Sequence, residues 1–424
     1  MLGNSGWLIA EHLLRFVSAV VIGLWMARHL GPASFGRLSI LLTAITLFSL
    51  LARAGIDTIL IRELVAAPNQ ERETLRTARR AIGIGSAASL LLLGIAAVIR
   101  DAAAAEVVIV LLVLAIQPLC VNESLLQARL AVPRVVISRL ISSATVAGLR
   151  VALILNDAPV LLFAVTGFLE QLIGYLLMVL FVRQLPPASA TAIAETTPAQ
   201  DVRRRDILML FGKSWPTLIS AVAIFVQTRV DQLLIFQIAG PAEAGIYTAA
   251  VKFYEAWIVV PYFISTAFLP GLVAGAMNSS EQVETRLVLL YRLLIGASLA
   301  VAIVTTGLAR VIVSLTLGRA YEGAAGVLSI SIFAGIFSAM GSVNARYFVA
   351  SGLQRKLANR TLIAAALGIG LNLLVISRYG ITGCAWVTLF TTFVCNYALD
   401  YTDPELKQLR SIKHRALFGR LSSP

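Results

Sequence analysis

Charged side chains within long apolar stretches are the residues of this sequence best suited to bind a ligand. Charges of this kind are costly in a membrane, so they usually face a partner or a water-filled cavity. Six cations and five anions fit the description: Arg15, Arg53, Arg150, Arg229, Lys252 and Arg346, with Glu11, Asp57, Glu170, Asp231 and Glu255.

Helical spacing sorts some of these charges into neighbours on one helix face. Three pairs are three or four residues apart: Glu11 with Arg15, Arg53 with Asp57, and Lys252 with Glu255. Side chains at these spacings can neutralise each other. A structural ion pair within one helix is therefore an alternative to a binding role for all three pairs.

Arg150, Glu170, Arg229 and Asp231 have no such neighbour on their own helix. Arg229 and Asp231 are two residues apart, so they point to different faces of one helix. We expect Arg229 to line a cavity, because the alternative is an unpaired charge in lipid. Arg150 lies towards the outer end of its span, so it either lines the cavity or snorkels to the membrane surface.

The chemistry of these groups indicates an ionic ligand. Guanidinium groups match the oxygens of phosphate and pyrophosphate. The cations and anions nearly balance in number, however, so the charges alone do not decide whether the substrate is anionic. Glu11, Glu170 and Asp231 are candidates for an ion-coupling step, with either H⁺ or Na⁺.

Signatures of enzymes and of ATP-driven pumps are missing from the sequence. Gly212-Lys213-Ser214 resembles the end of a phosphate-binding P-loop, but Ile207 stands where that motif requires glycine. No His, Cys and carboxylate residues have the spacing of metal ligands. The sequence therefore predicts no enzyme, no catalytic residue, no metal site and no cofactor.

Composition identifies the elements that must position these charges. Hydrophobic residues make up 58% of the 424 residues and charged residues only 13%, whereas soluble domains carry about 25% charged residues. The mean hydropathy is +0.85. The runs are rich in Leu, Ala, Ile and Gly, which favours helices over barrel strands. We predict an all-α polytopic membrane protein.

Twelve apolar runs are long enough to cross a bilayer as helices. They cover residues 6–28, 36–60, 81–99, 105–126, 138–155, 158–182, 214–238, 246–273, 289–309, 323–350, 361–377 and 380–398. Residues 311–322 are interrupted by Gly318, Arg319 and Glu322, so we expect a loop or a re-entrant segment there.

The distribution of Lys and Arg indicates the orientation. With a cytoplasmic N-terminus, every segment on the inner side is basic, and the outer segments carry only Arg28, Arg100, Arg310, Arg319 and Arg378. Lys and Arg are retained on the cytoplasmic side, so both termini are predicted to be cytoplasmic. The same rule accounts for the net charge of +13 without a nucleic-acid partner.

A repeated turn divides the chain into two similar halves. Gly31-Pro32-Ala33-Ser34-Phe35-Gly36 recurs as Gly240-Pro241-Ala242-Glu243-Ala244-Gly245, each between two apolar runs. A spacing this long indicates two halves of one protein rather than a solenoid. Each half has six spans. Because six is even, both halves start on the same side of the membrane, so the repeats are parallel rather than inverted. Two unrelated turns that both needed Gly and Pro are the alternative.

The expected organisation follows from this repeat. Residues 1–182 and 214–398 form two six-helix lobes, residues 183–213 a cytoplasmic linker, and residues 399–424 a basic cytoplasmic tail. The pattern of the tail predicts a short amphipathic helix on the inner leaflet, with Leu406, Leu409, Ile412 and Leu417 as its apolar residues. A partly disordered tail is the alternative.

Several segments resemble polysaccharide-unit flippases, the O-antigen and exopolysaccharide translocases of the multidrug/oligosaccharidyl-lipid/polysaccharide exporter superfamily. They are Ala27–Gly36, Gly55–Arg62, Asp231 followed by Gly240–Ala250, and Gly318–Ala325. The resemblance covers nearly the whole chain, although its individual motifs are loose.

The resemblance implies two lobes around a central hydrated cavity and transport by alternating access. The implied substrate is an undecaprenyl-pyrophosphate-linked oligosaccharide, moved to the periplasmic leaflet of a bacterial inner membrane. Arg15, Arg53 and Arg229, with Arg150 as a further cavity residue, are the expected pyrophosphate contacts. A polymerase or glycosyltransferases are further partners that the resemblance suggests.

Two rival functions remain. A drug or organic-cation antiporter of the same superfamily would depend on acidic residues such as Asp231 and Glu170. A membrane-embedded polysaccharide polymerase or ligase typically needs an extended outer loop with charged catalytic residues, and the predicted outer loops are short.

Overall fold

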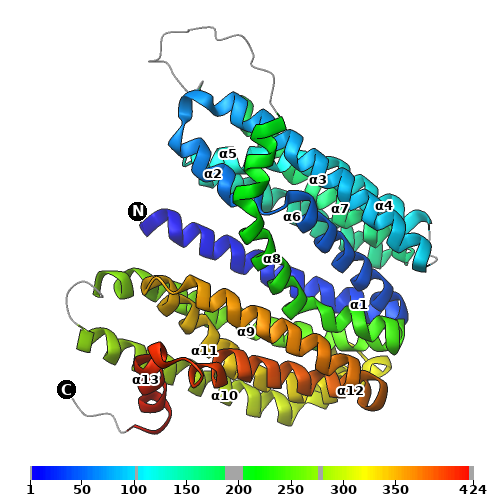
Figure 1. Ribbon diagram of the computed structural model, residues 1–424. Helices are drawn as coiled ribbons and strands as arrows, with labels where there is room; N and C mark the ends of the chain where they lie inside the picture. Colours follow the sequence, from blue (N-terminus) through cyan, green and yellow to red (C-terminus); the bar gives the residue numbers. More distant parts are fainter. Residues whose placement is uncertain (1, 101–103, 187–203, 276–279, 420–424) are drawn as a thin grey trace. The chain divides into compact units, whose positions relative to one another are not determined.

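The computed structural model describes residues 2–100, 104–186, 204–275 and 280–419, and over that part the chain is entirely helical (Figure 1). Side chains at 2–14, 96–100, 204–206, 269–275, 280–283 and 354 are not described. The chain forms two compact units. Unit 1 comprises Met1–Ile22 and Leu38–Val222, and unit 2 comprises Gly23–Arg37 and Ala223–Pro424.

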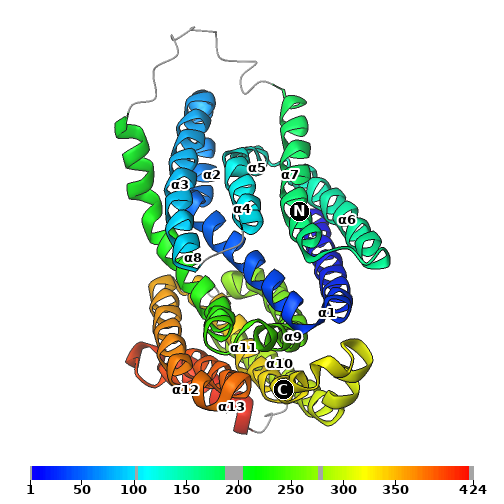
Figure 2. The same ribbon diagram turned by 90° about the vertical axis from the view of Figure 1, so that its right-hand side faces the viewer.

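Unit 1 is built mainly from the helices of the first half. They are α1 (Leu2–Arg53) without its segment Gly23–Arg37, α2 (Ile56–Ala66), α3 (Glu71–Arg100), α4 (Ala104–Ile116), α5 (Val121–Ala128), α6 (Val132–Leu155), α7 (Val160–Arg183) and the first part of α8 (Arg204–Ile238). Short 3₁₀ turns lie at Pro68–Gln70 and Gln117–Cys120. Both views show α6 and α7 packed side by side (Figures 1 and 2).

Unit 2 contains the rest of α8 and the later helices. These are α9 (Pro241–Gly275), α10 (Ser280–Thr316), α11 (Gly323–Ala350), α12 (Gln354–Asn396) and α13 (Lys407–Phe418). Three 3₁₀ turns, Arg319–Tyr321, Ala398–Asp400 and Pro404–Leu406, connect them. The most extensive packing in this unit is between α11 and its neighbours α9, α10 and α12.

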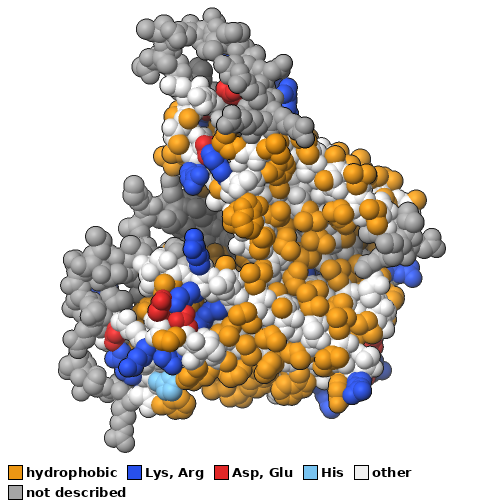
Figure 3. All heavy atoms as spheres, in the orientation of Figure 1, with side chains coloured by type: hydrophobic (Ala, Val, Ile, Leu, Met, Phe, Trp, Pro, Cys, Tyr) orange, Lys and Arg blue, Asp and Glu red, His pale blue; other side chains and the backbone are white. Residues whose placement is uncertain are grey.

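The prediction of a helical membrane protein is confirmed. Nine helical stretches of the described chain are long and apolar enough to cross a membrane. Two of them are 52 and 46 residues long and contain breaks at Gly31 and Gly380, where φ is 73° and 56°. Figure 3 shows hydrophobic side chains over much of the visible surface, with Lys and Arg gathered near α13. The number of twelve spans stays a prediction.

The two Gly-Pro turns pack against each other within unit 2. A Cβ on Gly36 would lie 1.9 Å from the carbonyl oxygen of Pro241, and a Cβ on Gly245 would lie 2.0 Å from that of Pro32. Each turn therefore places its last glycine on the proline carbonyl of the other. No side chain fits this approach, which explains why both copies end in glycine.

The predicted loop or re-entrant segment at 311–322 is wrong in its first half. Helix α10 continues to Thr316, and only the 3₁₀ turn Arg319–Tyr321 follows before α11. The apolar residues 311–316 extend the helix, and the polar interruption begins after it. Similarly, α8 begins at Arg204, so the end of the segment predicted as a linker is helical, and residues 187–203 lie outside the described residues.

The basic tail forms the predicted helix, α13, but its apolar face contacts protein. Leu409 and Ile412 are fully buried in a core shared with α10 and α11, so the disordered alternative is wrong for residues 407–418. The Lys413 ammonium is buried 2.5 Å from Asp400, which also binds Arg360. Burial lowers the pKa of Lys413 to about 8, although Asp400 opposes the shift.

Candidate functional site

A polar cavity in unit 1 brings together three of the predicted site residues. It has a volume of about 200 Å³ and lies between α1, α6 and α7. Its lining residues are Arg15, Phe16, Ser18, Ala19, Ile22, Ser143, Ala147, Arg150 and Glu170. The side chain of Glu11, the fourth candidate from this part of the chain, lies outside the described side chains.

Arg150 and Glu170 are partners across two helices. Arg150 Nη2 lies 3.3 Å from Glu170 Oε2, and Arg150 Nε donates to Thr166 Oγ1 at 2.9 Å. Thr166 is buried, and its hydroxyl donates to the carbonyl of Phe163 on its own helix at 2.7 Å. The guanidinium therefore has a neutral anchor as well as a charged partner.

The short α6–α7 turn explains why these residues meet. Helix α6 ends at Leu155 and α7 begins at Val160, so the two helices form a tight hairpin. Residues at similar distances from the turn lie opposite each other, which places Thr166 across from Arg150. Glu170 lies one helical turn further on the same face of α7.

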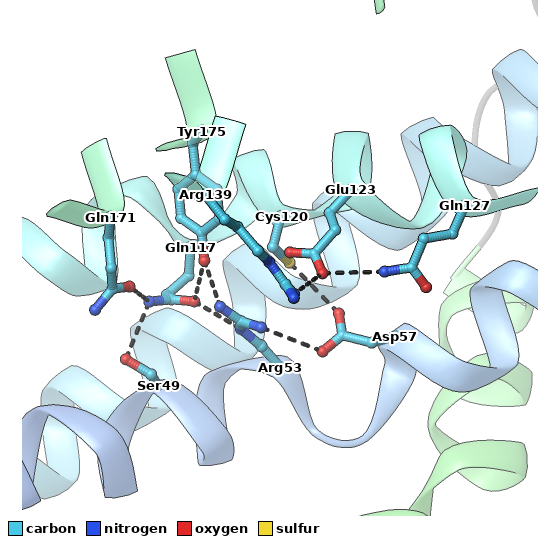
Figure 4. Close-up of polar contacts among 10 residues, drawn as sticks. All are labelled: Ser49, Arg53, Asp57, Gln117, Cys120, Glu123, Gln127, Arg139, Gln171 and Tyr175. Atoms are coloured by element: carbon cyan, nitrogen blue, oxygen red, sulfur yellow. Dashed lines mark hydrogen bonds and ion pairs between the residues drawn. The ribbon is translucent and has the colours of Figure 1, made fainter. Parts of the chain in front are cut away.

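Arg53 occupies a separate polar network in unit 1 (Figure 4). Its Nε donates to Gln117 Oε1 at 2.9 Å, its Nη1 lies 3.5 Å from Asp57 Oδ2, and its Nη2 donates to the hydroxyl of Tyr175. The ion pair of Arg53 with Asp57, the alternative to a binding role, is present, but it joins α1 to α2 across the break at Gly55 rather than lying within one helix. All three guanidinium nitrogens thus have partners within the protein.

Local breaks in the helices position this network. Arg53 is the last residue of α1, and Gly55, with φ of 70°, allows the chain to turn into α2. Gln117 begins the 3₁₀ turn between α4 and α5, where Pro118 cannot continue the α-helical hydrogen bonds. The amide of Gln117 is buried and donates to Ser49 and Gln171, each at 3.0 Å.

A second ion pair extends the network. Glu123 accepts hydrogen bonds from Arg139 and, at 3.1 Å, from Gln127 Nε2. The thiol of Cys120 lies 3.6 Å from Asp57 Oδ1. Figure 4 shows these side chains converging from α1, α2, α5, α6 and α7 and the turn after α4. The charges here are neutralised within the protein.

Unit 2 holds the remaining predicted site residues. Arg229 Nη1 lies 2.9 Å from Glu255 Oε1, so Glu255 of α9 forms a salt bridge to the neighbouring helix α8. Asp231 is buried and accepts from the hydroxyl of Tyr247 at 2.5 Å and from the backbone of Gln232 at 2.8 Å. As predicted, Arg229 and Asp231 have different surroundings.

A polar path continues from Asp231 to the last long helix. The hydroxyl of Tyr247 lies 3.2 Å from Thr388 Oγ1 on α12. Asp231 is thus enclosed by side chains from α9 and α12, whereas Arg150 lines a cavity. Across the residues that the structure describes, no group of three His, Cys, Asp or Glu side chains is arranged to hold a metal ion.

Sequence reasoning missed the neutral partners. Thr166, Gln117, Tyr175 and Tyr247 hold charged residues in place, but none is charged and none is close in sequence to the group it holds. Only Thr166 had a usable signal, its position opposite Arg150 about the α6–α7 turn.

Comparison with known proteins gives a family for most of the chain. The family described as polysaccharide biosynthesis protein matches residues 1–275. A search of curated proteins finds no match. The comparison of folds, in contrast, finds several solved transporters.

Three solved structures illustrate the fold. An inward-facing multidrug resistance MATE family transporter of the MOP superfamily is 15% identical, with a TM-score of 0.72 over 94% of this chain and 95% of the other. The lipid II flippase MurJ, in an inward closed conformation, is 13% identical, with a TM-score of 0.71 over 98% and 91%. A MOP superfamily transporter from Pyrococcus furiosus, whose binding pocket has reversed polarity, is 16% identical, with a TM-score of 0.55 over 97% and 96%. This chain therefore has the fold of MOP superfamily transporters.

Proposed function

Because this chain belongs to the polysaccharide biosynthesis protein family, we propose that it is a flippase for lipid-linked polysaccharide repeat units. The substrate is an undecaprenyl-pyrophosphate-linked oligosaccharide, which moves from the cytoplasmic to the periplasmic leaflet of a bacterial inner membrane. Its product serves the synthesis of a surface polysaccharide such as O-antigen, capsule or exopolysaccharide.

The observation that carries this proposal is the polar cavity of unit 1. Arg15 and Arg150 line it together with the hydroxyls of Ser18 and Ser143. Guanidinium groups and hydroxyls are suitable donors for a diphosphate. In a protein with the fold of a transporter, such a cavity fits a headgroup that must be taken through the membrane.

The proposed topology has twelve spans in two parallel six-helix lobes, with both termini in the cytoplasm. Alternating access would expose a central cavity to each leaflet in turn. Arg229 of unit 2 is a further proposed pyrophosphate contact, since its partner Glu255 leaves it 36% exposed. Arg53 stays a candidate, but binding substrate would require it to leave three protein partners.

Asp231 is the strongest candidate for a coupling-ion site. It is a buried carboxylate whose described partners are a hydroxyl and a backbone N–H. A buried carboxylate with no salt bridge among the described residues can gain a proton or hold a Na⁺ ion at the least cost. Glu170 has a cationic partner and Glu11 lies outside the described side chains, so both are weaker candidates.

A multidrug or organic-cation antiporter is the second proposed function. The fold similarity to a MATE transporter, with a TM-score of 0.72, favours it. Cationic side chains in the cavity of unit 1 favour the flippase instead, because they repel an organic cation. A polysaccharide polymerase or ligase is less favoured, since the two similar solved structures with the higher TM-scores above are a transporter and a flippase.

Replacement of Arg229 by alanine tests the assignment in cells. We expect surface polysaccharide to be lost while the protein remains in the membrane, and lipid-linked oligosaccharide to accumulate on the cytoplasmic leaflet. Normal export by this variant would show that Arg229 is not a pyrophosphate contact. Drug resistance conferred on a sensitive strain by the wild-type protein would favour the antiporter.

A further inference from the structure

We infer that Glu170 is an internal competitor of the substrate: its carboxylate occupies Arg150 when the cavity is empty and gives it up to the diphosphate of the lipid. This inference rests on the proposed flippase function and deepens it. Glu170 would set how tightly the headgroup is held, and hence how readily it leaves.

The geometry of the pair is suited to exchange. Arg150 Nη2 and Glu170 Oε2 are 3.3 Å apart, whereas charge-assisted hydrogen bonds are usually about 2.7–2.9 Å long. A structural pair in the same unit is tighter, because Arg129 binds both oxygens of Glu71 at 2.7 Å. The contact between Arg150 and Glu170 is therefore a loose one.

Arg150 keeps its position when its anionic partner changes. Its Nε is held by Thr166 Oγ1 at 2.9 Å, on the same helix as Glu170 but one turn earlier. Thr166 is fully buried and its hydroxyl is itself fixed to Phe163. A phosphate oxygen can thus replace the carboxylate at Nη2 without reorientation of the guanidinium.

The charges that line the cavity explain why competition must occur. Arg15 and Arg150 are its cationic lining residues and Glu170 is its anionic one. A diphosphate linked to a lipid and to a sugar is a dianion, so Glu170 repels it and also holds one of the two cations. Removal of the carboxylate charge should therefore increase affinity.

A transporter gains from such a competitor. Its site must bind strongly enough to load the substrate and weakly enough to release it. Glu170 lowers the affinity for the headgroup, because its carboxylate binds Arg150 again as the headgroup leaves. A neutral residue at 170 should hold the substrate too tightly.

Binding of undecaprenyl diphosphate to the purified full-length protein tests the inference. The variant is Glu170→Gln, and the matched control is Glu123→Gln, which neutralises a carboxylate of unit 1 that is bound to Arg139 outside the cavity. We expect Glu170→Gln to bind at least about fivefold more tightly, the lower end of typical coupling between two interacting sites. The control should bind as the wild type does.

A double variant assigns the effect to Arg150. In an Arg150→Gln background, Glu170→Gln should bring a smaller gain, because only the relief of charge repulsion remains once the residue for which the carboxylate competes is gone. A purely structural role for Glu170 cannot tighten binding. If Glu170→Gln does not fold, Glu170→Asp, which keeps the charge but withdraws it from Arg150, should bind more tightly than wild type.

The outcomes separate the inference from the proposed function. Wild-type protein that binds the lipid diphosphate, with Glu170→Gln equal to it or weaker, would overturn the inference and leave the flippase function standing. A gain that is just as large in the Arg150→Gln background would overturn it too. Absence of binding in wild type and every variant would overturn the proposed function.

Discussion

Arg53 and Arg150 occupy two regions of the same unit and resemble each other in exposure, with side chains 29% and 20% accessible. Their surroundings nevertheless differ. Arg53 binds three side chains through three nitrogens. Arg150 lines a cavity, with one neutral anchor and one loosely bound carboxylate.

An arginine within a membrane span can therefore offset the cost of its charge in two distinct ways. It can complete an internal network, or it can face a hydrated cavity and remain available. Exposure alone does not distinguish the two. The number and kind of its partners distinguish them, and on this basis Arg150 is better suited than Arg53 to bind the diphosphate.

Helix α7 serves both regions with adjacent residues. Gln171 accepts from Gln117 in the Arg53 network, whereas Glu170 lines the cavity. Successive residues of a helix point about 100° apart, so one turn can contribute to two sites. Substitutions at the two regions should therefore have separable effects on stability and on transport.

Arg150→Gln should have the largest effect, which falls on transport. A charge-assisted hydrogen bond contributes about 1.5–3 kcal/mol, so the affinity for the lipid diphosphate should fall about tenfold to a hundredfold. The protein should still fold, because Glu170 is 31% exposed and can be hydrated. Surface polysaccharide in a complemented deletion strain is the measurement, and normal levels would place the headgroup elsewhere.

Arg53→Gln should act on stability instead. It removes the donors to Gln117 and Tyr175, both buried. Leaving a buried polar group unsatisfied costs about 1–3 kcal/mol. Thermal unfolding in detergent should show a lower midpoint than wild type. A variant with unchanged stability but lost affinity for the lipid diphosphate would show that Arg53 binds the substrate.

Thr166→Val should have a smaller effect than either arginine substitution. It preserves the shape of the side chain and removes the acceptor for Arg150 Nε. One neutral hydrogen bond contributes about 0.5–1.5 kcal/mol, so affinity for the diphosphate should fall about twofold to tenfold. Isothermal titration provides the test. A loss as large as that of Arg150→Gln would mean that Thr166 contacts the lipid itself.

Asp57→Asn should have the smallest effect. Asp57 is 38% exposed and lies 3.5 Å from Arg53, which retains two other partners. Exposed ion pairs contribute about 0–1 kcal/mol. Export should be normal and the unfolding midpoint nearly that of wild type. A large loss of export would show that the Arg53 network takes part in transport, as the Arg150 cavity is proposed to do.

Much of the fold follows from local patterns in the sequence. Apolar runs predict the long helices, and Gly31 and Gly240 predict turns that the structure confirms with φ of 73° and 91°. The i,i+4 spacing offers an ion pair of Arg53 with Asp57 as one of two alternatives, and the structure contains that pair across the break at Gly55. Each of these depends on residues close in the chain, which is why the sequence is sufficient.

The sites depend on contacts between distant residues. Arg53 meets Gln117 and Tyr175, which are 64 and 122 residues away, so spacing along one helix gives no sign of them. The contact between Gly36 and Gly245 likewise needs the packed fold. The pairing of Arg150 with Glu170 is an intermediate case, since the short α6–α7 turn fixes which residues face each other.

One paired measurement tests the central claim that the Arg150 cavity, and not the Arg53 network, takes the diphosphate. Undecaprenyl diphosphate binding and the thermal unfolding midpoint are measured on the same samples of wild type, Arg150→Gln and Arg53→Gln. We expect Arg150→Gln to lose binding and keep its unfolding midpoint, and Arg53→Gln to keep binding at temperatures below its lowered midpoint. Full binding by Arg150→Gln, with binding lost in a stable Arg53→Gln protein, would contradict it.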